Sequence, residues 1–115
     1  MPLLMISSSS PVPEGKRKEL LAAASKIVAE STGKPEKYVM VTLVDAGVMM
    51  AGKEEPAAFA DVRSIGGLER EVNQTISQKL GELFQKKLEI PPARVYITFT
   101  EVPAANWGYD GGTFG

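Results

Sequence analysis

Apolar residues recur at helical spacing in two long segments of the chain, and residues that end helices follow each segment. The first segment covers residues 14–32, after which Gly33 and Pro35 are typical of a helix C-terminus. The second covers residues 68–88 and stops before a pair of prolines at positions 91 and 92. We therefore predict two amphipathic helices.

Four shorter runs of β-branched and apolar residues predict strands. These runs cover residues 3–7, 38–44, 57–65 and 94–102. Residues 46–56 show no clear period and are expected to be irregular. The order of elements is therefore strand, helix, strand, and this order occurs twice.

An offset of 56 residues aligns the two halves of the chain and indicates an internal repeat. Pro35 then aligns with Pro91, and Thr42 aligns with Thr98. Two right-handed βαβ units predict a four-stranded mixed sheet with both helices on one face. We classify the chain as α/β (α+β), a single domain over residues 1–115 with two βαβ units related by a pseudo-twofold axis.

The second and fourth predicted strands have two different faces. Alternation directs one set toward the helices, namely Val39, Val41, Leu43, Val95, Ile97 and Phe99. The other set points away from the helices and consists of Met40, Thr42, Val44, Tyr96, Thr98 and Thr100. Methionine, valine and tyrosine are large for an ordinary wet surface. The open face of the sheet therefore predicts self-association.

The composition excludes several classes of function. With 13 Lys+Arg against 14 Asp+Glu, the chain shows no basic patch for nucleic acid or for a membrane surface. No stretch approaches the length of about 18 apolar residues that spans a membrane, and no signal-peptide pattern is visible. We therefore expect a cytoplasmic protein. The chain has no Cys and no His, so we expect no disulfide, no metal and no cofactor.

The lack of histidine also removes the usual catalytic base. The group whose ordinary pKa then lies closest to neutrality is the α-amino group, at about 7.7–8.0. Pro2 follows the initiator Met1, so removal of Met1 would leave a secondary amine at the chain terminus. Burial or a nearby cation such as Lys34 would lower the pKa of that amine. The simpler interpretation is that Pro2 only allows the initiator to be removed.

Three further segments carry candidate chemistry, and each also has a simpler structural interpretation. Lys34 at the predicted helix exit either binds an anion or is an ordinary surface lysine. The glycines within residues 64–70 either leave backbone N–H groups free for an anion or form only a turn. The tail, residues 103–115, is unusually aromatic for a chain end. It either packs on the core, contacts another subunit or lines a pocket.

Five segments of the chain form a recognisable series: MPLLMI, TGKPEKYVMV, EEPAAFADVRSIGG, PPARVYITF and AANWGYDGGTFG. In this order, and with the proline behind Met1, they resemble the macrophage migration inhibitory factor family of the tautomerase superfamily. The resemblance spans essentially the whole chain. It implies the tautomerase fold and a homotrimer whose three sheets form a barrel, which would use the open face of the sheet.

The resemblance also implies an activity and a set of site residues. The activity is proton transfer between the keto and enol forms of aromatic α-keto acids such as phenylpyruvate, with dopachrome as a further candidate. Met1 would be removed and Pro2 would be the catalytic base. Lys34 would bind the substrate carboxylate, the Ile65 backbone would donate a hydrogen bond, and Tyr96 would enter from the neighbouring subunit.

The chain departs from the animal members of this family at several of these positions. Thr98 replaces an asparagine, Trp107 replaces a valine and Tyr109 replaces a tryptophan, so we expect a reshaped pocket mouth. AAFA at 57–60 replaces a Cys-Ala-Leu-Cys motif, so we expect no oxidoreductase activity. The alternative function is a signalling or binding protein with weak or vestigial tautomerase activity. Such a protein could leave the cell by a route that needs no signal peptide.

Overall fold

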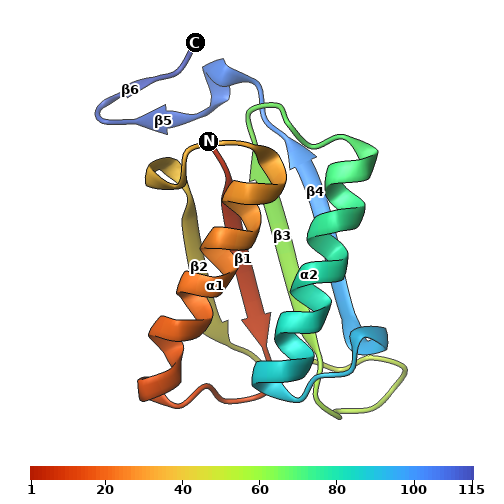
Figure 1. The fold of residues 1–115 in the computed structure, drawn as a ribbon. Helices are drawn as coiled ribbons and strands as arrows, with labels where there is room; N and C mark the ends of the chain where they lie inside the picture. The colour runs from red at the N-terminus through yellow and green to blue at the C-terminus, as the bar shows by residue number, and fades with distance from the viewer.

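The computed structural model describes residues 1–115 and contains the two predicted βαβ units (Figure 1). Its main elements are β1 (Leu3–Ser8), α1 (Glu14–Thr32), β2 (Met40–Asp45), β3 (Ala58–Ser64), α2 (Arg70–Leu88) and β4 (Val95–Glu101). The strand order is β2-β1-β3-β4. β1 is parallel to β2 and antiparallel to β3, and β3 is parallel to β4. The predicted fold class, a mixed four-stranded sheet with both helices on one face, is confirmed.

The internal repeat extends to the turns that follow the two helices. A 3-10 helix, η1 (Glu36–Tyr38), comes after α1, and η2 (Pro92–Arg94) occupies the corresponding place after α2. These turns shorten the predicted strands 38–44 and 94–102, which begin at Met40 and Val95. The reason is local, because the proline that precedes each turn is incompatible with a helix but suits the start of a tight turn.

The starts and ends of the helices follow backbone conformation. α2 begins at Arg70 and not at residue 68, because Gly66 and Gly67 both adopt positive φ angles, of 72° and 81°, and lengthen the turn. α1 ends at Gly33, which takes the left-handed conformation as predicted. Glu89, at the matching position after α2, takes the same conformation without being a glycine.

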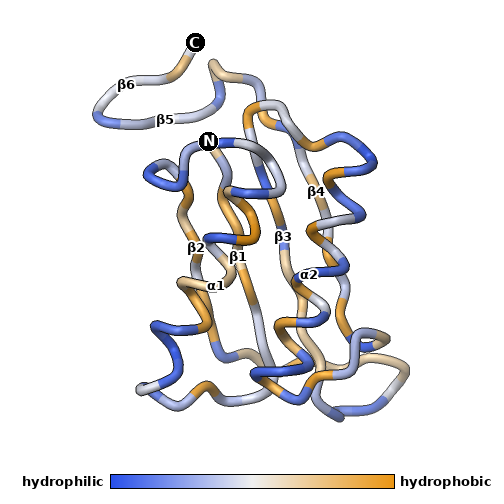
Figure 2. The backbone as a smooth tube through the Cα atoms, in the orientation of Figure 1, coloured by the Kyte–Doolittle hydropathy of each residue, from blue (hydrophilic) through white to orange (hydrophobic).

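The hydrophobic core lies between the two helices and the sheet, and Figure 2 shows apolar segments along the strands and on parts of both helices. The core side chains with the least exposure include Leu4, Ile6, Val62, Leu20, Val28, Ile76, Leu80 and Phe84. The predicted helix-facing residues of β2 and β4 also pack on this core. Most of them are only partly buried, because β2 and β4 are the edge strands of the sheet.

The opposite face of the sheet carries large exposed side chains, as predicted. The strand register aligns Val44, Ser7, Phe59 and Tyr96 in one row across the four strands. Of these, Val44 is 53% exposed, Phe59 41% and Tyr96 66%. Met40, near the other end of β2, is 62% exposed. Burial of this row in a second copy of the chain would remove a large apolar area from water.

Arg94 organises the segment between β2 and β3, residues 46–57. Its guanidinium donates four hydrogen bonds of 2.9–3.1 Å to the backbone carbonyls of Met50, Lys53, Glu55 and Pro56. The segment also contains a short antiparallel bridge between Met50 and Lys53. The segment was predicted to be irregular, and it does lack a helix or a long strand. Its backbone carbonyls are nevertheless held by specific hydrogen bonds.

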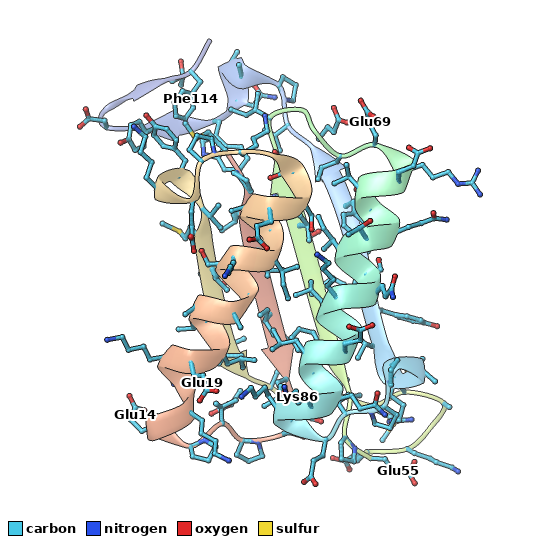
Figure 3. All side chains as sticks on the ribbon, in the orientation of Figure 1. Glu14, Glu19, Glu55, Glu69, Lys86 and Phe114 are labelled. Carbon is cyan, nitrogen blue, oxygen red and sulfur yellow. The ribbon has the colours of Figure 1, made fainter.

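The tail forms structure of its own above one end of the sheet (Figure 1). It contains a 3-10 turn, η3 (Ala104–Asn106), and a short hairpin of β5 (Gly108–Tyr109) and β6 (Gly112–Thr113). Figure 3 places Phe114 over the end of the sheet where the chain begins, while Lys86 and Glu55 lie near the opposite end.

Neither helix is both long and apolar enough to cross a membrane.

Candidate active site

A cavity of about 340 Å³ lies where the chain terminus, η1 and the tail meet. It is lined by Met1, Pro2, Leu3, Lys37, Tyr38, Val39, Met40, Trp107, Gly108, Tyr109 and Phe114. Most of this lining is apolar or aromatic. The strand order brings these segments together, because β1 lies beside β2 and both strands start at this end of the sheet.

Pro2 is held at the floor of the cavity. It is almost completely buried, and its carbonyl accepts a hydrogen bond of 3.1 Å from the Met40 N–H. While Met1 is attached, the Pro2 nitrogen is an amide without a hydrogen or a basic lone pair. Removal of Met1 would turn the same buried nitrogen into a secondary amine.

Lys34 lies against the turn after β3, and neither Lys34 nor Ile65 is among the residues that line the cavity. The Lys34 ammonium donates a hydrogen bond of 3.0 Å to the Ile65 carbonyl. Gly67 makes room for this side chain, because a Cβ atom at position 67 would lie 3.1 Å from Lys34 Cε. The Ile65 N–H takes part in no backbone hydrogen bond outside the strand ladders, so it is available to another acceptor.

The electrostatic setting of the chain terminus favours an uncharged amine. Burial and, to a smaller extent, the positive charge of Lys34 lower the pKa of the Met1 α-amino group below its ordinary value. The cause is that water is partly excluded at this position and a cation lies close by. These are the two effects that the sequence analysis gave as able to lower the pKa of a terminal amine.

The tail aromatics form one side of the cavity. Tyr109 stacks on Phe114 with ring centroids 5.3 Å apart, and it meets the Tyr38 ring edge-on at 5.9 Å. The Phe114 N–H donates to the Trp107 carbonyl at 3.1 Å, which closes the hairpin. The tail therefore packs against η1 and the chain terminus.

Tyr96 and Thr98 do not reach this cavity within one chain. The register pairs Tyr96 with Phe59, and Phe59 with Ser7, so Tyr96 lies two strands and five residues along β1 from Pro2. At about 3.3 Å per residue, the five residues alone separate them by about 16 Å. The Thr98 hydroxyl donates instead to Asp61 at 2.7 Å. A role for either residue at the Pro2 cavity requires a second subunit.

Several residues of the cavity lining were not placed at the site by sequence reasoning, among them Lys37, Tyr38 and Met40. Tyr38 was assigned to the start of a strand, although it lies in η1. The sequence signal that could have placed Tyr38 at the site was an aromatic residue three positions after the proline that follows a helix.

A second, more open hollow of about 420 Å³ lies between α1 and β2, but it contains neither Pro2 nor Lys34.

The mixed sheet, the two helices on one face and the proline behind Met1 in an aromatic cavity are those of a protein of the tautomerase fold. The family model described as macrophage migration inhibitory factor (MIF) matches residues 1–115, and the chain belongs to this family.

Relatives and solved structures agree with this family. The macrophage migration inhibitory factor of Meriones unguiculatus is 36% identical over 118 residues, which cover 99% of each chain. The crystal structure of the homologue from Prochlorococcus marinus has a TM-score of 0.93 and 38% identity, and the match covers 98% of this chain and 99% of that one. The structure of Pt0534 inactivated by 2-oxo-3-pentynoate has a TM-score of 0.85 and 28% identity, with 96% and 93% covered.

Proposed function

We propose that the protein is a cofactor-free keto–enol tautomerase of aromatic α-keto acids such as phenylpyruvate, with Pro2 as the base. The observation that carries this proposal is the buried Pro2 at the floor of an aromatic cavity. Lys34 adds a positive charge close enough to lower the pKa of the terminal amine. Membership of a family in the tautomerase superfamily supports the same class of reaction.

In the proposed reaction, the neutral Pro2 amine removes a proton from the carbon next to the keto group. The electron pair of that C–H bond moves into the new carbon–carbon double bond, and negative charge develops on the carbonyl oxygen. This oxygen then takes a proton from water, and the Pro2 ammonium returns its proton to water, which completes the enol and restores the neutral amine. The Lys34 ammonium holds the substrate carboxylate, and the Ile65 N–H donates a hydrogen bond to the substrate.

The inactivated relative supports a pocket for 2-oxo acids. Pt0534 is inactivated by 2-oxo-3-pentynoate. This compound carries a carboxylate beside a ketone, and an alkyne conjugated with the ketone makes it an electrophile. A buried amine beside a cation, as at Pro2 and Lys34, is suited both to bind such an acid and to react with it.

We test the activity with phenylpyruvate and with protein whose processed N-terminus is verified by intact mass. The enol is followed by its ultraviolet absorbance. We expect a rate well above that of the same concentration of free proline, because only the protein positions the amine in a dry cavity. A rate equal to that of free proline would contradict the proposal. Dopachrome is assayed in parallel as the second candidate substrate.

We further propose a homotrimer in which Tyr96 and Thr98 of one subunit complete the cavity of its neighbour. The exposed row on the open face of the sheet, with Phe59 and Tyr96, supports burial against other copies. Sedimentation at micromolar concentration should show a species of three times the chain mass. Val44→Asp places a charge in this row and should shift that species toward the monomer. A stable monomer of the unchanged protein would contradict a shared cavity.

A further inference from the structure

The cavity has a second cation that the proposed reaction does not use. Among the residues that line it, Lys37 is the only one with a charged side chain, and no carboxylate is among them. Lys34 is not part of this lining, because it reaches toward the Ile65 carbonyl. A substrate in the cavity would therefore meet Lys37 as the charged side chain of the lining, and would reach Lys34 only beyond that lining, beside the Ile65 turn.

Lys37 keeps its charge free for a ligand. It takes part in none of the three salt bridges of the chain. Its neighbour Glu36 is turned toward α1, where its carboxylate accepts a hydrogen bond of 3.0 Å from the Ser25 hydroxyl. The carboxylate closest in sequence is thus already engaged away from the cavity.

The Lys37 ammonium lies against the aromatic wall of the cavity. Its nitrogen lies 5.0 Å from the centroid of the Tyr38 ring, a distance at which a cation is attracted to the ring face. The Tyr38 ring in turn meets Tyr109 edge-on, and Tyr109 stacks on Phe114. The cation therefore belongs to the same packed group of rings that would contact an aromatic substrate.

Lys37 and Pro2 lie at opposite depths of the cavity. Pro2 is almost fully buried, whereas Lys37 is exposed at the mouth. The backbone of Met40 is bonded to Pro2, and the three residues from Lys37 to Met40 span at most about 11 Å. Lys37 therefore lies within reach of the far edge of a substrate ring whose keto acid is at Pro2.

We propose that Lys37 binds an anionic group at the far end of the substrate, so that the preferred substrates are aromatic α-keto acids with a second carboxylate on the ring. This inference rests on the proposed function, because it places the reacting keto acid at Pro2. Lys37 then acts on specificity, and the proton transfer remains with Pro2.

The kinetic test compares phenylpyruvate with 4-carboxyphenylpyruvate. The unchanged protein should give a higher kcat/KM for the second substrate. Lys37→Gln should lower the ratio of kcat/KM for 4-carboxyphenylpyruvate to kcat/KM for phenylpyruvate about tenfold. The change should arise mainly from a higher KM for 4-carboxyphenylpyruvate, because one charged hydrogen bond to its ring carboxylate is lost. Lys26→Gln makes the same change of charge on α1, outside the cavity lining, and should leave the ratio unchanged. An unchanged ratio in Lys37→Gln would overturn the inference.

A binding test separates this inference from the proposed function. Phenylacetate and 4-carboxyphenylacetate serve as probes without a keto group, and their affinities are measured by NMR titration. Tighter binding of the dianion that is lost in Lys37→Gln would support the anion site even if phenylpyruvate is not turned over. Equal affinities in an active enzyme, with an unchanged kinetic ratio, would overturn the Lys37 site and leave the tautomerase intact.

Discussion

Protein that retains Met1 is expected to fold and assemble like the processed protein but to tautomerise phenylpyruvate about a thousandfold more slowly, the typical contribution of a general base. The reason is covalent, because an attached Met1 makes the Pro2 nitrogen an amide that cannot accept a proton. Pro2 is buried in the folded chain with Met1 attached, so the fold does not require removal of Met1 and the loss should not reflect a change of fold.

The comparison uses two matched samples of the same chain, one with Met1 retained and one processed, both verified by intact mass. Circular dichroism and sedimentation control for fold and assembly. Acetylation of the processed terminus should give the same loss, whereas Pro2→Gly should keep part of the activity through its primary amine. Equal rates for the two homogeneous samples would show that Pro2 is not the base.

The pH dependence of the processed protein follows from the same amine. Only the unprotonated amine is a base, so activity should rise with pH as the amine loses its proton. Burial and Lys34 lower the pKa of the Met1 α-amino group. Pro2 is almost fully buried, so we expect the same direction for its amine once Met1 is removed. The midpoint of the rise should therefore lie below that of an ordinary α-amino group.

Lys34→Ala should lower kcat/KM for phenylpyruvate by about 1.5–3 kcal/mol, or roughly 10- to 150-fold, because one charged hydrogen bond to the substrate carboxylate is lost. The methyl ester of phenylpyruvate lacks that charge and should lose much less. The substitution also removes a cation that lowers the pKa of the terminal amine. The pH profile should therefore move to higher pH.

Lys26→Ala is the matched control, since it removes a lysine from an exposed part of α1. Lys34→Arg keeps the charge and should leave the pH profile near its original position. Equal losses for the acid and its ester, with an unmoved pH profile, would show that Lys34 supports only the turn at Ile65.

The sequence was sufficient for the elements whose signals are periodic. The helical spacing and the repeat at 56 residues determine α1, α2 and the sheet, because each pattern buries one face of an element on the common core. The starts of β2 and β4 were wrong by one or two residues. Two 3-10 turns compete with the strands there, and the apolar pattern alone does not separate them.

The candidate site was predictable only in part. Lys34 and Ile65 were placed at one site only by the resemblance to the family, and the structure brings them into contact. Lys37 and Tyr38 were not found, since the cavity is formed by three segments far apart in the sequence. Their contribution depends on how η1 packs against the tail, which no local pattern encodes. Tyr96 is far from the Pro2 cavity within one chain, so the structure of a single chain does not test its predicted role.

The hydrogen bonds of Arg94 hold the loop between β2 and β3 without depending on the side chains of the residues that accept them. All four acceptors are backbone carbonyls, which every amino acid supplies. The side chains of these four acceptor residues can therefore vary while their bonds are retained, provided that a planar donor with several N–H groups stays at position 94. Gly52, at a φ of 72°, and the buried Ala57 are constrained by backbone conformation and packing. A single residue at the end of η2, just before β4, thus holds a long connection through backbone contacts, so substitutions at the acceptor positions can change the surface there while the path of the chain is kept.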